Sequence, residues 1–160
     1  MRKVEEHRVG QINSMSYWHT VRSPLRVIPT AFVFEACKFI PSLALKRFLY
    51  RIFGMKLGKN VSVGLRAAFD VFFPELIEIG DNSIIGYDTL ILTHEFLVDR
   101  WRKGAVKIGR NVMIGANCTI LPGVAIGDNS VIGAHSLVNH DVPANSFWGG
   151  VPAKPIRKGR

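Results

Sequence analysis

Aliphatic residues return at every sixth position between Ile108 and Pro143. Cut into sixes, this stretch reads IGRNVM, IGANCT, ILPGVA, IGDNSV, IGAHSL and VNHDVP. Each block opens with an aliphatic residue, usually followed by Gly, and carries a small residue at its fifth place. A fixed period of six residues is typical of a β-helix, in which successive repeats stack into a solenoid. The rest of the chain can be placed relative to this solenoid.

The same period is present earlier in the chain. Blocks LGKNVS and VGLRAA start at Leu57 and Val63, and after a looser block and four extra residues, 75–78, the pattern resumes at Ile79. Gly follows the leading aliphatic residue in two blocks of every three, so the full repeat is eighteen residues long. Three blocks per turn predict an all-β solenoid, a triangular prism of about four coils. We expect the leading aliphatic residues inside it, with Gly supplying corner conformations that other residues disfavour.

Three segments flank or interrupt the predicted prism, which occupies residues 55–143. Residues 1–54 combine a polar segment with an amphipathic helical cap, residues 97–107 form a loop excursion between hexads, and residues 144–160 form a basic tail. The polar residues 1–23 indicate no function. At 160 residues, the chain suits one short solenoid with appendages.

A short amphipathic helix is predicted directly before the hexads. Its apolar residues at helical spacing are Leu45, Phe48, Leu49 and Ile52. Ser42 can cap its start, and Gly54 can close its end. The other face carries Lys46, Arg47 and Arg51, which fits either a cap with solvated charges or peripheral contact with a membrane surface. We favour the cap, because the end of a β-helix exposes backbone edges and apolar interior that must be covered.

Charge and cysteine content narrow the partners and the compartment. The formal net charge of +9 favours anionic partners, among them a phosphate-bearing cofactor, nucleic acid or an anionic membrane. The sequence has no recognised nucleic-acid motif, so we expect no nucleic-acid binding. Cys37 and Cys118 form no C-x-x-C motif, which indicates reduced thiols. The start of the sequence lacks the apolar core of a signal peptide and therefore predicts a cytoplasmic protein.

Three motifs occur together between Leu57 and Arg157. They are the tripeptide THE at 93–95, the run IGANCTILPGVAIGDNSVIGA at 114–134, and the ending GGVPAKPIR at 149–157. Together they resemble the hexapeptide-repeat acyltransferases, the group that contains maltose, galactoside and nodulation-type O-acetyltransferases. The resemblance implies a left-handed β-helix, a hand that spacing alone does not reveal because parallel crossovers are normally right-handed.

The resemblance also implies a reaction and a general base. It implies acetyl transfer from acetyl-CoA to a hydroxyl of a saccharide, without a metal, in a homotrimer with active sites between neighbouring prisms. The general-base histidine of the family matches His94, and a neutral imidazole can take the proton from an attacking alcohol. Glu95 stands where regular blocks hold a small inward residue. It either needs a partner, such as an imidazole that it orients, or is a local departure caused by the loop.

Cofactor-binding positions are carried over from the same motifs. In the family, coenzyme A lies along the groove between two prisms. The matching positions are Ala116, Ala134, Asn139, His140, Lys154 and Arg157. The last two suit the phosphates of the cofactor, unless they belong to a solvated basic tail. His135 departs from the family pattern at a usual Gly, and His140 replaces a usual Lys, which would make cofactor affinity depend on pH.

Two further residues are candidates for contact with the acceptor. Asp70 breaks the Gly rule one turn before His94 on the same face of the prism. Trp101 lies in the excursion and offers a flat apolar face to a sugar ring, or else anchors the loop against a neighbouring subunit. The acceptor itself is open, and the basic apolar helix also permits a lipid-linked or polymer-bound saccharide.

Two other classes of function remain open at this stage. The gamma-type carbonic anhydrases build zinc sites on the same prism from three histidines across a subunit interface, and His94 with the pair His135 and His140 offers that number. The flanking sequence IGAHSLVNHDVP does not match the pattern of that family. A non-catalytic scaffold is the remaining alternative.

Overall fold

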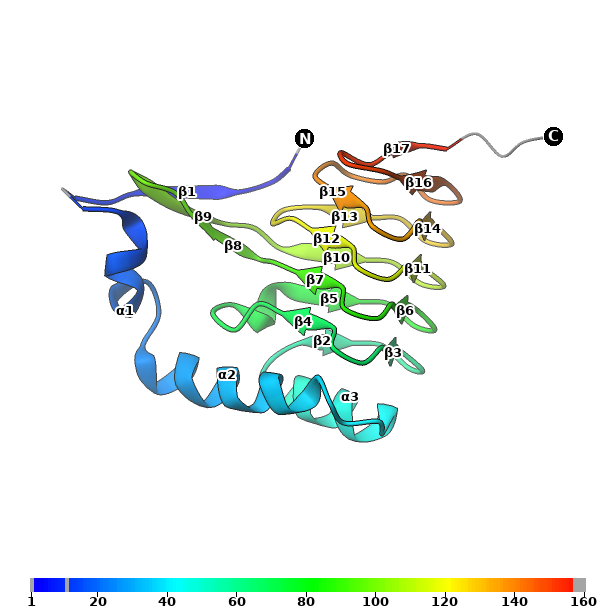
Figure 1. Ribbon diagram of the computed structural model, residues 1–160, viewed down its shortest axis with the longest axis horizontal. Helices are drawn as coiled ribbons and strands as arrows, with labels where there is room; N and C mark the ends of the chain where they lie inside the picture. The colour runs from blue at the N-terminus through cyan, green and yellow to red at the C-terminus, as the bar shows by residue number, and fades with distance from the viewer. Residues whose placement is uncertain (1, 11, 157–160) are drawn as a thin grey trace.

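The chain forms a triangular prism that stands on a layer of helices, as seen in the computed structural model, which describes residues 2–10 and 12–156 (Figure 1). The first coil contains β2 (Lys56–Leu57), β3 (Ser62–Val63) and β4 (Ala68–Phe69). The second contains β5 (Ile77–Ile79), β6 (Ile84–Ile85) and β7 (Leu90–Ile91). The third contains β10 (Val106–Ile108), β11 (Met113–Ile114) and β12 (Thr119–Ile120). The fourth contains β13 (Ala125–Ile126), β14 (Val131–Ile132) and β15 (Leu137–Val138).

Each coil adds one strand to each of three parallel sheets. Their orders are β13-β10-β5-β2, β17-β16-β14-β11-β6-β3 and β15-β12-β7-β4. The second sheet is extended by β16 (Phe147–Gly149), and β17 (Lys154–Pro155) folds back antiparallel onto β16. Residues 144–156 therefore continue the prism, where the sequence had predicted a basic tail.

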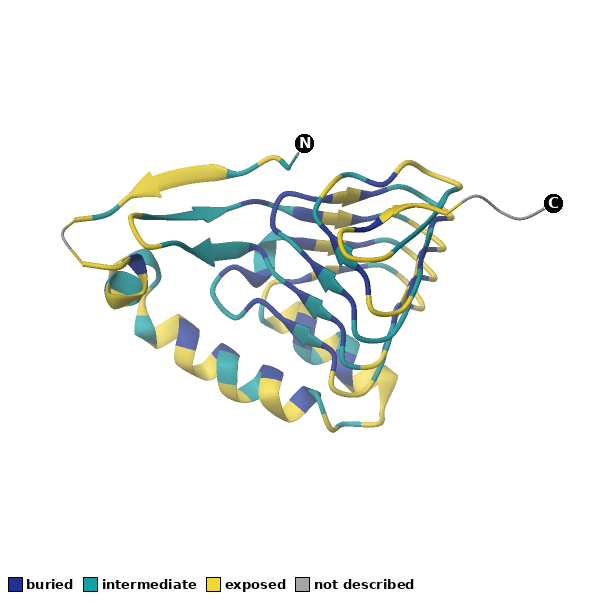
Figure 2. Cartoon of the chain, turned by 45° about the horizontal axis from the view of Figure 1, so that its top comes forward, coloured by how far each residue is buried: buried dark blue, intermediate teal, exposed yellow. Residues whose placement is uncertain are grey.

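The core of the prism is a stack of the leading aliphatic residues. Ile85, Ile114 and Ile132 lie above one another in neighbouring parallel strands and are buried, as are the small residues at the fifth place (Figure 2). Burying such columns is the main favourable contribution to folding. The predicted β-helix of four coils is confirmed.

The glycines of the hexads have a different role from the predicted one. A Cβ atom on Gly80 would lie 2.6 Å from the carbonyl carbon of Gly109, so close stacking of the coils excludes a side chain there. The left-handed conformation instead belongs to the fourth place of most blocks, as at Asn82, Asn111 and Asn129. Asparagine tolerates this conformation, and these side chains form a hydrogen-bonded ladder along one corner.

Helices between β1 and the first coil cover the lower end of the prism. They are η1 (Ser14–Tyr17), α1 (Trp18–Val21), α2 (Pro24–Cys37) and α3 (Leu43–Ile52), with η2 (Pro74–Leu76) between the first two coils. Helix α3 is the predicted one, and the Ser42 hydroxyl accepts a hydrogen bond from the Leu45 N–H at 3.3 Å. Helix α2 was not predicted, because Pro29 within it is a residue that normally argues against a helix. Among the described residues, no helix is both long and apolar enough to cross a bilayer.

The direction of the hydrogen bonds between coils explains what α3 must cover. The N–H of Gly64 donates to the carbonyl of Ile85, and the N–H of Gly86 donates to that of Ile114. Each coil thus gives its N–H groups to the carbonyls of the next coil. No coil lies below the first one to donate N–H groups to its carbonyls. A buried carbonyl without a hydrogen bond lowers the stability of the fold, so these carbonyls need another donor.

Three basic side chains of α3 supply the missing donors. The ammonium group of Lys46 donates to the carbonyls of Val63 and Gly64 at 3.1 and 2.9 Å. The guanidinium of Arg47 donates to Val61, and that of Arg51 donates to Leu57 and Gly58. Lys46 is only 1% exposed, and this burial lowers its pKa. The predicted cap is confirmed, but the prediction that its charges are solvated is wrong.

Replacing Lys46 by Met tests this cap, because the change keeps the length of the side chain and removes its donors. We expect the free energy of unfolding to fall by about 1–3 kcal/mol, since two buried carbonyls lose their partner. Urea unfolding followed by circular dichroism measures the change. The same substitution at the exposed Lys56 is the control and should change stability by less than about 0.5 kcal/mol. Equal stability of both variants would contradict the capping role.

Candidate active site

The chain leaves the prism at His94 and forms a protruding hairpin. The hairpin consists of β8 (His94–Phe96) and β9 (Arg100–Lys103), and β1 (Glu5–Arg8) adds to it as an antiparallel outer strand. The N–H of Gly104 donates to the carbonyl of Thr93 and closes the base of the hairpin. The excursion therefore covers residues 94–105 and begins three residues before the predicted start, because strand pairing begins at His94 itself.

Asp70 holds the imidazole of His94 from the coil below. The Nδ1 atom of His94 lies 2.5 Å from Oδ2 of Asp70. The same oxygen accepts the N–H groups of Thr93 and His94, while Oδ1 accepts those of Phe72 and Phe73. Burial by itself would raise the pKa of this carboxyl, but the hydrogen bond and charge of His94 and the backbone donors outweigh it and lower the pKa. Asp70 is therefore an ionised, rigidly held acceptor.

This contact determines which nitrogen of His94 is available. An ionised carboxylate can only accept hydrogen bonds, so Nδ1 donates its proton to Asp70, and Nε2 is the ring nitrogen left outside this contact. The His94 side chain remains 12% exposed, which leaves the ring in contact with solvent. Phe72 and Phe96 lie 4.5 and 4.9 Å from the imidazole, measured between ring centroids. The result is an imidazole held in a fixed orientation in an aromatic environment.

Asp70 and Glu95 have other contacts than the sequence suggested. The side chain of Asp70 is fully buried and faces His94, so it is not open to an acceptor as predicted. Glu95 does not orient the imidazole. Its Oε2 atom lies 2.6 Å from Nε of Arg102 and 3.0 Å from Nη1 of Arg2. Glu95 lies in the hairpin, where the inward position of a regular block no longer exists, and the two arginines balance its charge.

Trp101 is already stacked inside the chain. Its ring lies 4.3 Å from that of His7 at an interplanar angle of 16°, and 5.9 Å from that of Phe73 at 6°. The predicted open face for a sugar ring is thus occupied by neighbouring aromatic residues. Trp101 connects β1 to the prism wall and fixes the hairpin.

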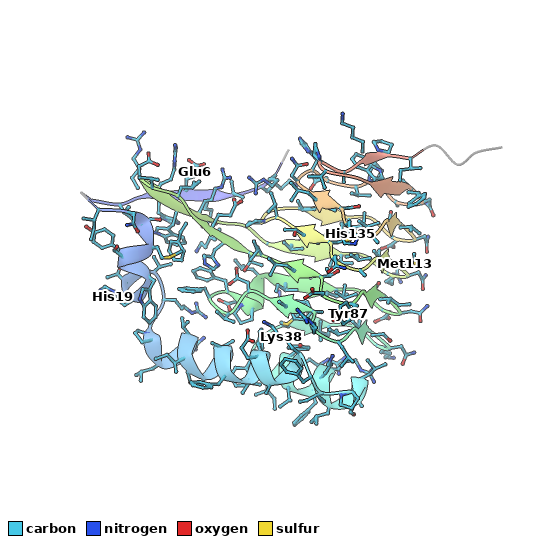
Figure 3. The ribbon with its side chains drawn as sticks, in the orientation of Figure 1. Glu6, His19, Lys38, Tyr87, Met113 and His135 are labelled. Atoms are coloured by element: carbon cyan, nitrogen blue, oxygen red, sulfur yellow. The ribbon has the colours of Figure 1, made fainter. Side chains whose placement is uncertain are left out.

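The predicted cofactor positions lie at the two ends of the strands in the β15-β12-β7-β4 sheet. These strand ends form two of the long edges of the prism, and we use the word edge in that sense. Asn139 and His140 follow β15 on the edge where His94 follows β7, and they line a groove of about 380 Å³ with Arg2 and Arg102. Ala116 and Ala134 precede β12 and β15 on the opposite edge, together with His135, whose N–H donates to the carbonyl of Ala116. Figure 3 shows His135 on the coils of the prism, well away from Glu6 on the hairpin side.

Lys154 and His135 make no described contact with the side chains around His94. Lys154 lies exposed in β17, and Arg157 lies outside the described residues. His135 occupies a corner with a φ of 55°, the conformation that asparagine adopts elsewhere in the prism. Across residues 2–10 and 12–156, no group of three or more His, Cys, Asp or Glu side chains is placed to hold a metal ion.

Sequence reasoning missed the arginines and phenylalanines around this site. Arg2 comes from the chain start, to which no function was assigned, and reaches Glu95 only because β1 pairs with the hairpin. Phe72 belongs to the looser block FDVFFP, whose run of aromatic residues was the available signal. Arg102 was visible as one of several basic residues in the excursion, but its pairing with Glu95 was not.

The chain is similar to several acetyltransferases. A family profile described as "Bacterial transferase hexapeptide (six repeats)" matches residues 105–140. The "Putative acetyltransferase YvoF" of Bacillus subtilis (strain 168) is 46% identical over 159 residues, which cover 98% of this chain and 91% of that protein. The galactoside O-acetyltransferase of Escherichia coli (strain K12) is 39% identical over 112 residues, covering 63% and 55% of the two chains.

Solved structures share the fold. A galactoside acetyltransferase in complex with coenzyme A superimposes with a TM-score of 0.68 and 27% identity, covering 84% of this chain and 81% of that one. A hexapeptide-repeat acetyltransferase of Vibrio cholerae, VCA0836, has a TM-score of 0.69 at 23% identity and covers 90% of both chains.

Replacing Asp70 by Asn tests the buried carboxylate through its pH dependence. At pH 7 we expect the free energy of unfolding to fall by about 1.5–3 kcal/mol, because hydrogen bonds to a charged acceptor are lost. The carboxyl pKa is lower in the folded protein than its ordinary value of 3.8, so its contribution is complete above that pH and is lost as the pH falls through the folded value. The gap between variant and wild type should therefore narrow below pH 3.8.

Urea unfolding curves at neutral and acidic pH measure this gap. The exposed Glu78, replaced by Gln, serves as the control and should show little effect at either pH. A gap for Asp70→Asn that is the same at pH 7 and at the acid end would show that the carboxyl is not ionised in the folded protein.

Proposed function

Because the chain belongs to the hexapeptide-repeat acetyltransferase family, we propose that it transfers the acetyl group of acetyl-CoA to a hydroxyl of a saccharide, with His94 as general base. The observation that carries this proposal is the contact between His94 and Asp70, which leaves Nε2 of the imidazole as a proton acceptor. The galactoside O-acetyltransferase relative supports a saccharide acceptor, and the related structure with bound coenzyme A supports the acyl donor.

The chemistry follows from the two residues. Nε2 of His94 takes the proton of the acceptor hydroxyl while its oxygen attacks the thioester carbonyl. The new C–O bond forms, the C–S bond breaks, and the imidazolium returns the proton to the sulfur of the departing thiolate. The Asp70 carboxylate keeps the ring in one tautomer. It also stabilises the positive charge that the imidazolium carries between the two proton transfers. Phe72 and Phe96 limit the access of water to this proton transfer.

The placement of the cofactor residues supports a site shared between subunits. Asn139 and His140 lie on the His94 edge of the sheet, whereas Ala116 and Ala134 lie on the opposite edge. In a homotrimer of side-by-side prisms, the His94 edge of one subunit would face the Ala134 edge of the next. Coenzyme A would then lie in the groove between them, with Lys154 near its phosphates. The same role for Arg157 rests on the sequence alone, because that residue lies outside the described ones.

The remaining candidates act as positioning residues in this proposal. Glu95 joins Arg2 to Arg102 and so holds the start of the chain against the hairpin, and Trp101 of the hairpin stacks on His7 of β1 and on Phe73 of the prism. Both features fix the hairpin at the edge of the groove. The buried, unpaired thiols of Cys37 and Cys118 fit a protein of the reducing cytoplasm, where acetyl-CoA is used.

Replacing His94 by Ala tests the base. We expect kcat for acetylation of a galactoside or maltose acceptor to fall by about 10²–10⁴-fold, the usual contribution of general-base catalysis, with coenzyme A affinity unchanged. Thiol release from acetyl-CoA measures the rate, and calorimetry measures binding. His19→Ala, at an exposed histidine of α1, should keep the wild-type rate. Full activity without His94 would rule out this mechanism, and wild-type protein that does not bind coenzyme A would refute the proposed reaction.

A bulky residue at Ala134 tests the cofactor groove. We expect Ala134→Trp to raise the Kd for coenzyme A by about tenfold or more, because the indole would fill the groove, and tenfold corresponds to ~1.4 kcal/mol of binding. Ala144 is a matched control, because it stacks on Gly127 as Ala134 stacks on Gly115 and is likewise exposed. Calorimetry on both variants should show the loss only at position 134; equal losses would place the cofactor elsewhere.

A further inference from the structure

The helical cap turns a set of large apolar side chains away from the prism. We call this set the outer helical face: Leu25, Ile28, Phe32, Phe39, Leu43, Leu45, Phe48 and Ile52. Phe32, Phe39 and Phe48 are 75, 73 and 59% exposed, and exposed residues recur along α2 and α3 (Figure 2). Soluble proteins seldom gather so many large apolar side chains on one exposed surface without a partner for it.

The cap does not need these residues in order to cover the prism. On α2 the side that packs on the core of the prism carries Phe34 and Cys37, and on α3 it carries Lys46 and Tyr50. Helical geometry places Leu25, Ile28 and Phe32 on the opposite side of α2, and it places Phe48 and Ile52 away from the packed side of α3. Helix α3 is therefore oriented opposite to an ordinary amphipathic helix. Its basic side chains donate to the protein, and apolar side chains such as Phe48 and Ile52 face outward.

The charge around this surface is strongly basic. Residues 24–56 contain six Lys and Arg and a single Glu, Glu35. That glutamate is already paired with Lys38 at 2.5 Å. Lys46, Arg47 and Arg51 donate to carbonyls of the first coil, so Arg26 and Lys56 are the cations of this segment that remain exposed beside the apolar side chains. An apolar surface bordered by cations matches the surface of an anionic bilayer, in which aromatic and aliphatic side chains enter the headgroup region while lysines and arginines reach the phosphates.

We propose that the outer helical face binds the surface of a bilayer that contains anionic lipid. A second copy of the chain is a poorer occupant, because a two-fold contact through this face would bring two basic surfaces together. Side-by-side packing of prisms also leaves this layer free, since the helices lie below the first coil (Figure 1). The proposal is independent of the acetyl-transfer chemistry.

Docking of this kind would bring the neighbourhood of His94 close to the lipid surface. A cleft of about 440 Å³ opens between α2 and residues 71–75, and its lining includes Arg22, Arg26 and Phe72. The ring of Phe72 is also the nearest aromatic neighbour of His94 by centroid distance. One side chain thus connects the cleft beside the cap with the candidate active site.

Vesicle flotation with the full chain tests the proposal. The probes are vesicles of phosphatidylcholine alone and of phosphatidylcholine mixed with phosphatidylglycerol. We expect the wild-type protein to float with the mixed vesicles, less with phosphatidylcholine alone, and less at high salt. Replacing Phe32 and Phe48 together by Ser should weaken binding by about tenfold or more, because each buried phenylalanine contributes more than that factor in affinity.

Two controls separate docking from folding and from self-association. The pair Leu65→Ser and Met113→Ser removes exposed apolar side chains from the coils of the prism and should leave flotation unchanged. Thermal unfolding and coenzyme A binding of the Phe32/Phe48 variant should match the wild type, which shows that its fold is intact. The proposal is overturned if wild-type protein fails to float with the mixed vesicles or if both pairs of substitutions reduce flotation equally. It is also overturned if the Phe32/Phe48 variant changes only the oligomeric state in sedimentation.

Discussion

The carbonyl groups at the start of the prism set the main constraint on this chain. A coil of the β-helix receives its donors from the coil before it, so the first coil needs donors from another source. Lys46, Arg47 and Arg51 provide them, each at a carbonyl that a preceding strand would otherwise occupy. Helix α3 must therefore point its cations inward. Its apolar side consequently faces outward, and the exposed surface of the cap follows from the backbone chemistry of the prism.

The candidate site depends on the same stacking of coils. Asp70 and His94 are 24 residues apart, and the parallel pairing of β4 with β7 brings them to the same edge. Four backbone N–H groups and the imidazole donate to one buried carboxylate. Without these donors, burying the charge would destabilise the folded state. The interruption of the hexads then directs the chain outward from the imidazole that Asp70 holds. The regular prism supplies the rigidity, and its single long interruption places the candidate site.

Periodicity made the prism predictable, because each coil obeys the same local rule at every block. The leading aliphatic residues, the number of coils and α3 with its Ser42 cap could all be predicted from the sequence. What escaped prediction depends on contacts between distant segments. The partners of Glu95 come from Arg2 and Arg102, and α2 forms in spite of Pro29. The role of Asp70 became visible only with the register of β4 and β7, since the extra residues 75–78 hide it in the sequence.

The direction of the hydrogen bonds also bears on how such a chain can change in length. Carbonyl groups face the helical cap at one end, and at the other end β16 receives the N–H groups of the fourth coil and is closed by β17. Neither end can accept a new coil without losing its closure. An inserted unit of eighteen residues between two inner coils, by contrast, would meet donors below and acceptors above, as every inner coil does. Duplication or deletion of whole inner coils is therefore the route by which such a stack could become taller or shorter, with both ends kept.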